Sequence, residues 1–172
     1  MPPGYRIRPA TPADLPALDN VESRASELYS GLVPEETPLD NVPSETLRDA
    51  CENGRLFVAE AANGSVVGFA LLLLLDDGSV HLEELDVLPE HGRRGVGRAL
   101  IDACSRVARS HGHTTLTLST YRDVPFNAPF YARLGFRTLE PKEVTAALAR
   151  VVEIERNKGL DRSPRVLMRL EL

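Results

Sequence analysis

A glycine- and arginine-rich segment is the part of the sequence best suited to chemistry. Residues 92–98 separate a β-rich stretch from one with helical spacing. Closely spaced glycines let consecutive backbone N–H groups approach one anion, and a helix beginning near Gly97 adds unpaired N–H groups and the positive end of its dipole. Arginine side chains supply counter-charge. The predicted diphosphate-binding loop consists of Gly92, Arg93, Arg94, Gly95, Val96, Gly97 and Arg98.

The spacing within this loop excludes two common nucleotide-binding motifs. A P-loop needs four residues between its first glycine and a Gly-Lys pair followed by Ser or Thr, and no lysine is present here. A dinucleotide fingerprint reads G-x-G-x-x-G, whereas residues 92–97 read G-x-x-G-x-G. The loop therefore predicts phosphate binding of a different kind.

A second segment, Asn127–Phe136, lies downstream, and together the two segments resemble the GNAT superfamily of acyl-CoA-dependent N-acyltransferases. The phosphate loop of that family is written Q/R-x-x-G-x-G/A. Gly95 and Gly97 match its last two positions, and Gly92 departs from the first. The downstream segment is similar to the family's N…Y-x-x-L-G-F pattern. The resemblance extends over about residues 5–172.

The resemblance implies that acetyl-CoA is the acyl-donor cosubstrate. Leu85-x-Val87-x-Pro89 resembles the family's fourth strand, where the main chain of Val87 and Leu85 would pair with the amides of pantetheine. Asn127 is implied as a pantetheine contact, and the hydroxyl of Tyr131 is implied to lie near the thioester sulfur. Tyr131 is then the candidate general acid, since a phenol can return a proton to the leaving thiolate.

The strand before the loop supplies candidates for the general base. Simple alternation places His81, Glu83, Leu85 and Val87 on one face, and Glu84 and Asp86 on the other. We favour Glu83 as the base, because a carboxylate also attracts a cationic amine. His81 is the next candidate, and Glu84 replaces both if a bulge reverses the alternation.

Composition limits the partners. The net charge is −5, from 25 acidic and 20 basic residues, so we expect neither nucleic acid nor an anionic membrane as a partner. The longest apolar run, Phe69–Leu75, is far shorter than the roughly 20 residues that a spanning helix needs, and predicts a buried strand. No charged leader with an apolar stretch opens the chain, which predicts a cytoplasmic protein.

Cysteine and histidine spacing predicts no metal site. Cys51 and Cys104 lack CxxC spacing, which argues against a disulfide framework or a thiolate metal site. His111 and His113 lie at the expected end of a helix without partnered cysteines or carboxylates, and we interpret them as part of a capped terminus. A cysteine nucleophile is disfavoured, so direct attack by the amine is the simpler mechanism.

The elements that position these residues follow from periodicity and turn signals. A helix follows the Thr11–Asp14 cap and runs toward Leu28, and an Asn63-Gly64 turn predicts a hairpin. The strand expected at 114–118 follows a strand and a crossover helix, so it should pair parallel to the strand at 79–87. Strands are expected at 5–8, 56–61, 66–75, 79–87, 114–118, 136–139 and 166–170, and further helices at 44–51, 97–111, 128–134 and 144–158.

These elements predict one GNAT-type domain over residues 1–172, in the α/β (α+β) class. Its sheet is mixed and mostly antiparallel, its fourth and fifth strands splay apart, and helices flank it. The expected function is transfer of an acetyl group from acetyl-CoA to a primary amine of a small molecule. The acceptor pocket is expected among residues 31–43, 81–84 and 122–126. A catalytically silent acyl-CoA sensor is the alternative, and exposed sheet edges permit a homodimer.

Overall fold

The computed structural model describes all residues, 1–172, and contains one seven-stranded sheet. The strand order is β1-β2-β3-β4-β5-β7-β6, and every neighbouring pair is antiparallel except β4 and β5, which are parallel. This arrangement confirms the mixed, mostly antiparallel sheet. The strands are β1 (Tyr5–Pro9), β2 (Leu56–Ala61), β3 (Val66–Leu74), β4 (Val80–Val87), β5 (Thr115–Tyr121), β6 (Arg137–Thr138) and β7 (Arg165–Glu171).

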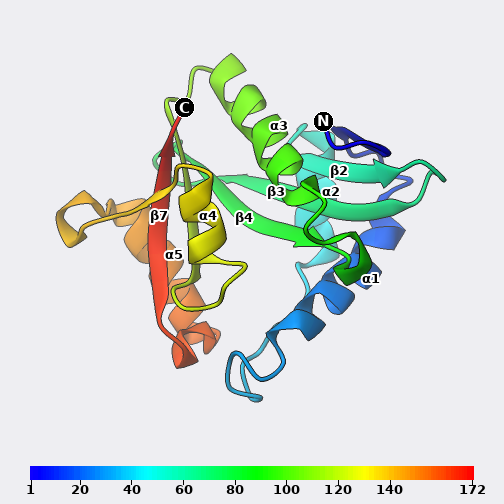
Figure 1. Cartoon of the computed structure of the whole chain (residues 1–172). Coiled ribbons are helices and arrows are strands. Elements are labelled where there is room, and N and C mark those ends of the chain that lie inside the picture. Colours follow the sequence, from blue (N-terminus) through cyan, green and yellow to red (C-terminus); the bar gives the residue numbers. More distant parts are fainter.

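Five α-helices flank this sheet (Figure 1). They are α1 (Leu15–Ser26), α2 (Ser44–Glu52), α3 (Val96–Ser110), α4 (Ala128–Arg133) and α5 (Ala146–Asn157), with single 3₁₀ turns at 27–29, 89–91, 141–143 and 160–162. The predicted order of strands and helices is thus confirmed. None of these helices has the length and apolar character needed to cross a membrane.

The hairpin of β2 and β3 forms the centre of the core. Gly64 has a φ of 85°, a left-handed conformation that the tight turn requires and that glycine adopts without strain. In β3 the residues from Val67 to Leu72 are all buried, because α1 and α3 both pack against this strand. The prediction of a buried strand in the apolar run Phe69–Leu75 is confirmed as far as Leu72, whereas Leu74 is 55% exposed.

A β-bulge interrupts β4 at Glu83. Leu71 of β3 pairs with Glu84, and the next residue, Leu72, pairs with Leu82, so Glu83 has no partner on β3. A bulge of this kind leaves one residue unpaired and reverses the alternation beyond it. Glu84 therefore points to the same side of the sheet as the residue before it.

The bulge overturns the simple alternation expected from the sequence. The expectation that Leu85 and Val87 share a face with His81 and Glu83 is wrong. Leu85 points toward α3, where it lies beside Gly97, whereas Glu84 and Asp86 point toward Glu22 of α1. The physical reason is the extra residue in β4, which moves both acids onto the α1 side.

The parallel pairing of β4 with β5 ends halfway along β4. Its last pair joins Leu82 to Leu118, although β4 continues to Val87 and β5 to Tyr121. Beyond this point β5 stays paired with β7, and β4 stays paired with β3. The two strands therefore splay as predicted, and the outer edge of β4 has no partner strand there.

Gly68 keeps β3 close to the splayed part of β4. A Cβ atom at this position would lie 2.7 Å from the carbonyl oxygen of Asp86, closer than real Cβ contacts allow. We predict that Gly68→Ala lowers the free energy of unfolding by about 1–3 kcal/mol, because β3 and β4 must separate to admit the methyl group. Urea titration measures this, with the exposed Ser65→Ala as control; equal midpoints for the two variants would contradict it.

Candidate active site

The loop between β4 and α3 presents a row of free backbone donors. Gly95 precedes the helix with a φ of 82°, and its carbonyl accepts the first hydrogen bond of the helix, from the N–H of Ala99 at 3.0 Å. The N–H groups of Val96, Gly97 and Arg98 have no acceptor in the protein. Together with the helix dipole, these donors form the kind of cradle that phosphate groups fit.

The arginines of the loop are free to neutralise an anion. The side chains of Arg93, Arg94 and Arg98 are exposed and take part in no ion pair. Arg93 has a φ of 58°, the only positive value outside glycine, so the backbone bends sharply at this point. Free guanidinium groups around unpaired N–H groups fit the diphosphate of a coenzyme A donor.

Two contacts fix the loop to other parts of the fold. The hydroxyl of Tyr5 lies 2.9 Å from Nδ1 of His91, and Arg24 of α1 pairs with Glu90 at 2.7 Å. Both contacts hold the 3₁₀ turn that precedes the glycines. The cradle is thus held from the first strand and from α1, neither of which is close to it in sequence.

The absence of a side chain at Gly97 brings three elements together. A Cβ atom there would lie 3.5 Å from the ring of Phe130 in α4 and 3.9 Å from Leu85 in β4. The start of α3, the outer edge of β4 and α4 therefore converge at the splay. The structure thus brings the loop, Leu85 and the Asn127–Phe136 segment together.

Tyr131 and Asn127 lie on the far side of the splay from β4. Tyr131 is 8% exposed and packs edge-on against Phe130 and Phe136. Burial raises the pKa of Tyr131 well above its ordinary value, and the charges of neighbouring groups that include Glu84 add a smaller effect in the same direction. The phenol therefore stays protonated at neutral pH, which is the state that a general acid needs.

The side chain of Asn127 contacts a residue that the sequence reading missed. Its Nδ2 donates to the hydroxyl of Tyr29 at 3.1 Å, and Tyr29 also packs against Phe126 with ring centroids 5.0 Å apart. Tyr29 ends the 3₁₀ turn that follows α1, where no periodic pattern marked it. This contact joins the end of α1 to the start of α4 across the opening.

The side chain of His81 is buried and bonded to the neighbouring strand β5. It is 1% exposed, and its Nδ1 lies 2.9 Å from the hydroxyl of Thr117, which itself donates to the carbonyl of Val80. Burial lowers the pKa of His81 to about 4, so the ring is neutral at neutral pH. His81 and Thr117 face each other within the paired part of β4 and β5, before the splay begins.

Three carboxyl groups gather on the α1 side of β4. Carboxylate oxygens of Glu22, Glu84 and Asp86 all lie within 4.8 Å of one another, and we call these residues the acidic cluster. Burial raises the pKa of Glu84 and of Asp86 well above the ordinary range, and neighbouring carboxylates add to the effect. The side chain of Glu83 is more exposed than that of Glu84, although burial raises the pKa of Glu83 as well. The bulge thus gives Glu84 the more enclosed position.

Glu22 was not identified from the sequence, although a signal was present. It lies in the buried stripe of α1 with Leu18, Val21 and Ala25, whose spacing is that of an apolar helix face. An acid within such a stripe is costly to bury unless something compensates it. Burial raises the pKa of Glu22 to about 7.

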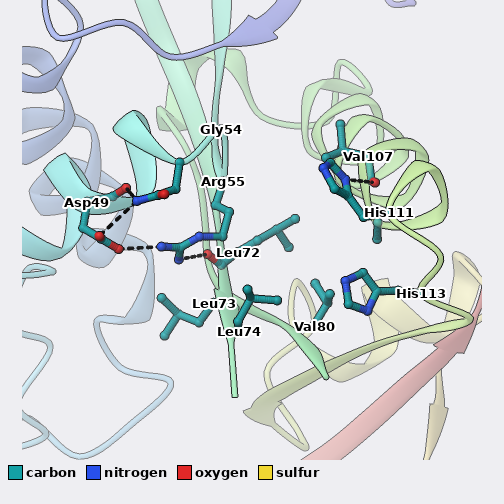
Figure 2. Close-up of a pocket in the computed structure, with 12 residues that line it drawn as sticks. Asp49, Gly54, Arg55, Leu72, Leu73, Leu74, Val80, Val107, His111 and His113 are labelled. Atoms are coloured by element: carbon teal, nitrogen blue, oxygen red, sulfur yellow. Dashed lines mark hydrogen bonds and ion pairs between the residues drawn. The ribbon is translucent and has the colours of Figure 1, made fainter. Parts of the chain in front are cut away.

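A cavity of about 410 Å³ lies at the other end of β4, and Figure 2 shows the side chains that line it. Arg55 in its wall is already paired with Asp49 and donates to the carbonyl of Leu72. His111, also in the wall, ends α3, and its Nδ1 lies 2.9 Å from the carbonyl oxygen of Val107. None of the predicted site residues lines this cavity.

Comparison with known sequences agrees with this geometry. A model described as the acetyltransferase (GNAT) family matches residues 25–136, which include the loop and the downstream segment. An aminoglycoside N(6′)-acetyltransferase type 1 of Stenotrophomonas maltophilia is 36% identical over 144 residues, which cover 78% of this chain and 87% of that protein.

Solved structures share the fold over nearly the whole chain. The PaiA N-acetyltransferase of Thermoplasma acidophilum, in complex with coenzyme A, has a TM-score of 0.72 at 17% identity, covering 98% of this chain and 99% of that one. Rv2747 of Mycobacterium tuberculosis, with CoA and NLQ, has a TM-score of 0.69 at 24% identity, covering 97% and 99%. Since the family model matches more than half of the chain, the protein belongs to the GNAT family of acetyl-CoA-dependent N-acetyltransferases.

Proposed function

We propose that the protein transfers the acetyl group of acetyl-CoA directly to a primary amine of a small molecule, with Glu84 as general base and Tyr131 as general acid. The observation that carries the proposal is the splay of β4 from β5. It has the cradle at one end, Tyr131 on one side and the half-buried carboxylate of Glu84 on the other.

The donor is bound by main-chain groups. The N–H groups of Val96, Gly97 and Arg98 hold the diphosphate, with Arg93 and Arg94 as counter-charge. The unpaired outer edge of β4, from Leu85 to Val87, binds the pantetheine arm as an added strand would. The N–H of Val87 is the proposed donor to the thioester oxygen.

The proton transfers follow from the two environments. Glu84 accepts a proton from the acceptor's ammonium group, so that the nitrogen lone pair attacks the thioester carbon. As the C–S bond breaks, Tyr131 donates its proton to the leaving sulfur, and the second proton that the nitrogen loses on becoming an amide restores the Tyr131 hydroxyl. We prefer Glu84 to Glu83, which is more exposed, and to His81, which is buried against Thr117.

The relative from Stenotrophomonas maltophilia supports a small cationic acceptor, since its name gives an aminoglycoside as its substrate. We therefore place the acceptor beside the acidic cluster, between α1 and β4.

A homodimer stays a prediction, which the unpaired edges at β1 and β6 permit.

CoA release from acetyl-CoA in the presence of a panel of amines tests the function, with calorimetric titration of acetyl-CoA alone as a parallel measurement. Amine-dependent release is expected. Tight binding of acetyl-CoA without release for any amine would instead favour the silent sensor. No binding at all would contradict the assignment of the cradle.

For Tyr131→Phe we predict a fall in kcat of roughly 10²-fold with little change in acetyl-CoA affinity, because the variant loses a proton donor and keeps the ring. Steady-state rates and calorimetry measure the two quantities. Phe136→Leu, which alters a ring that packs against Tyr131 and leaves its hydroxyl in place, controls for loosened packing. Unchanged turnover in Tyr131→Phe would remove the proposed role.

For Glu84 we predict a pH-dependent rate. A base must be ionised, so kcat/KM falls as pH drops through the pKa of Glu84, which burial raises well above the ordinary value. The acid limb should therefore lie well above pH 4.5, and Glu84→Gln should lose it together with roughly 10²-fold or more in rate. The matched control is Glu83→Gln, one residue earlier on the same strand. An acid limb that persists in Glu84→Gln and disappears in Glu83→Gln would reverse the assignment.

A further inference from the structure

The exposed face of α3 carries positive charge that no acid of the protein neutralises. Eight of the 18 arginines of the chain take part in no ion pair. Five of these eight are concentrated in the phosphate loop and on α3: Arg93, Arg94, Arg98, Arg106 and Arg109, all of them exposed. Because the net charge of the chain is −5, this face differs in sign from the molecule as a whole.

Three of these arginines lie on one face of the helix. With 3.6 residues per turn, Arg98, Arg106 and Arg109 point within about 80° of one another around the helix axis. At a rise of 1.5 Å per residue, Arg106 lies about 12 Å and Arg109 about 16 Å beyond Arg98. We call these three residues the basic stripe.

The needs of the helix do not account for the basic stripe. The helix dipole favours a cation in the last turn, which applies to Arg109. Arg98 lies in the first turn, where the dipole disfavours a cation, and Arg106 lies between the two ends. Asp102 is the only acid of α3 and is spaced four residues from both Arg98 and Arg106, yet it forms no ion pair. The guanidinium groups are therefore free for a partner.

The donor cradle uses only the first part of this charge. Its N–H groups belong to residues 96–98, and the loop arginines directly precede them. Arg106 and Arg109 lie two or more helical turns further on, beyond the reach of a diphosphate bound at the cradle. A partner that contacts both the cradle and these two arginines must be larger than a diphosphate and must extend along α3.

We propose, resting on the function proposed above, that an acidic protein carrying an acetyl group on a phosphopantetheine arm docks on the basic stripe as a second donor. Phosphopantetheine is the part of coenzyme A between the thiol and the first phosphate, so the same arm fits the outer edge of β4. Its phosphate then lies at the cradle, and acidic side chains of the carrier pair with Arg106 and Arg109, whose planar guanidinium groups suit carboxylates.

The transfer step is the same for both donors. The nitrogen of the acceptor forms the amide bond as the C–S bond between the acetyl group and the arm breaks. Glu84 and Tyr131 handle the protons as they do with acetyl-CoA, and the carrier leaves with a free thiol on its arm. The basic stripe takes no part in the chemistry, because it contacts only the surface of the carrier.

Nucleic acid and an anionic membrane are the competing partners of a basic surface. The sequence of α3 contains no aromatic residue on which a base could stack. The basic stripe ends after about 16 Å, and the negative net charge opposes a polyanion that extends further. A carrier protein also accounts for the position of the basic stripe, which begins at the cradle where the arm's phosphate would be held.

Three acetyl donors test the proposal: acetyl-CoA, acetyl-phosphopantetheine, and a bacterial acyl carrier protein acetylated on its phosphopantetheine thiol. Each is assayed with the amine that gives the fastest CoA release, by mass spectrometry of the acetylated product. We expect transfer from all three. Arg106→Glu and Arg109→Glu should each lower kcat/KM for the carrier by roughly tenfold and leave both small donors unchanged, because a charge at the rim of an interface acts mainly on association.

The matched control is Arg48→Glu, which reverses another exposed arginine without an ion pair, on α2. It should leave kcat/KM for the carrier as in the wild type. Added salt should slow the carrier reaction of the wild type more than that of Arg106→Glu, since the variant has already lost part of the screened attraction. Circular dichroism of the variants checks that α3 still forms.

The outcomes separate this inference from the proposed function. Three results would overturn the carrier site and leave the transferase standing: no transfer from the carrier while acetyl-CoA is active, an equal loss for acetyl-CoA and the carrier in Arg106→Glu, or an equal loss in Arg48→Glu. Binding of a short DNA duplex or of phosphatidylglycerol vesicles that Arg106→Glu abolishes would overturn it in favour of that partner. No transfer from any of the three donors would refute the proposed function itself.

Discussion

The end of the parallel ladder between β4 and β5 is the constraint on which the site depends. A strand inside a sheet normally has its backbone groups paired on both edges. Beyond Leu82 the outer edge of β4 has no partner, while its inner edge remains bound to β3 as far as Val87. The bulge at Glu83 lies one residue past the last parallel pair. The same short stretch therefore opens the sheet and turns two acids toward α1.

Charge compensation differs between the scaffold and the site. In the scaffold, the guanidinium of Arg8 beside Asp14 holds the pKa of that carboxyl well below its usual range, and Arg165 pairs with Glu155 while lying over the ring of Tyr121. At the splay, burial acts without such partners and raises the pKa of Glu84 and of Tyr131. Groups with perturbed pKa values and no partner within the protein are typical of a site in which a bound substrate supplies the partner.

Much of the architecture could be predicted because it depends on local signals. Asn63-Gly64 predicted the hairpin turn, and the apolar spacing after the glycine loop predicted α3. The parallel pairing of β5 followed from the right-handed crossover rule. The loop before α3 could be predicted in the same way from its arginines and glycines, since backbone donors at a helix start need no distant partner.

By itself, then, the sequence determined the order of strands and helices, the glycine-rich turn before α3 and the family, because turn residues, periodicity and closely spaced motifs act within a few residues. Only the tertiary structure decided which acid faces the splay. The bulge at Glu83 arises from the register between β3 and β4, and Glu22 and Tyr29 reach the site through the packing of α1 against the sheet. These are contacts between residues far apart in the chain, and local spacing carries no information about them.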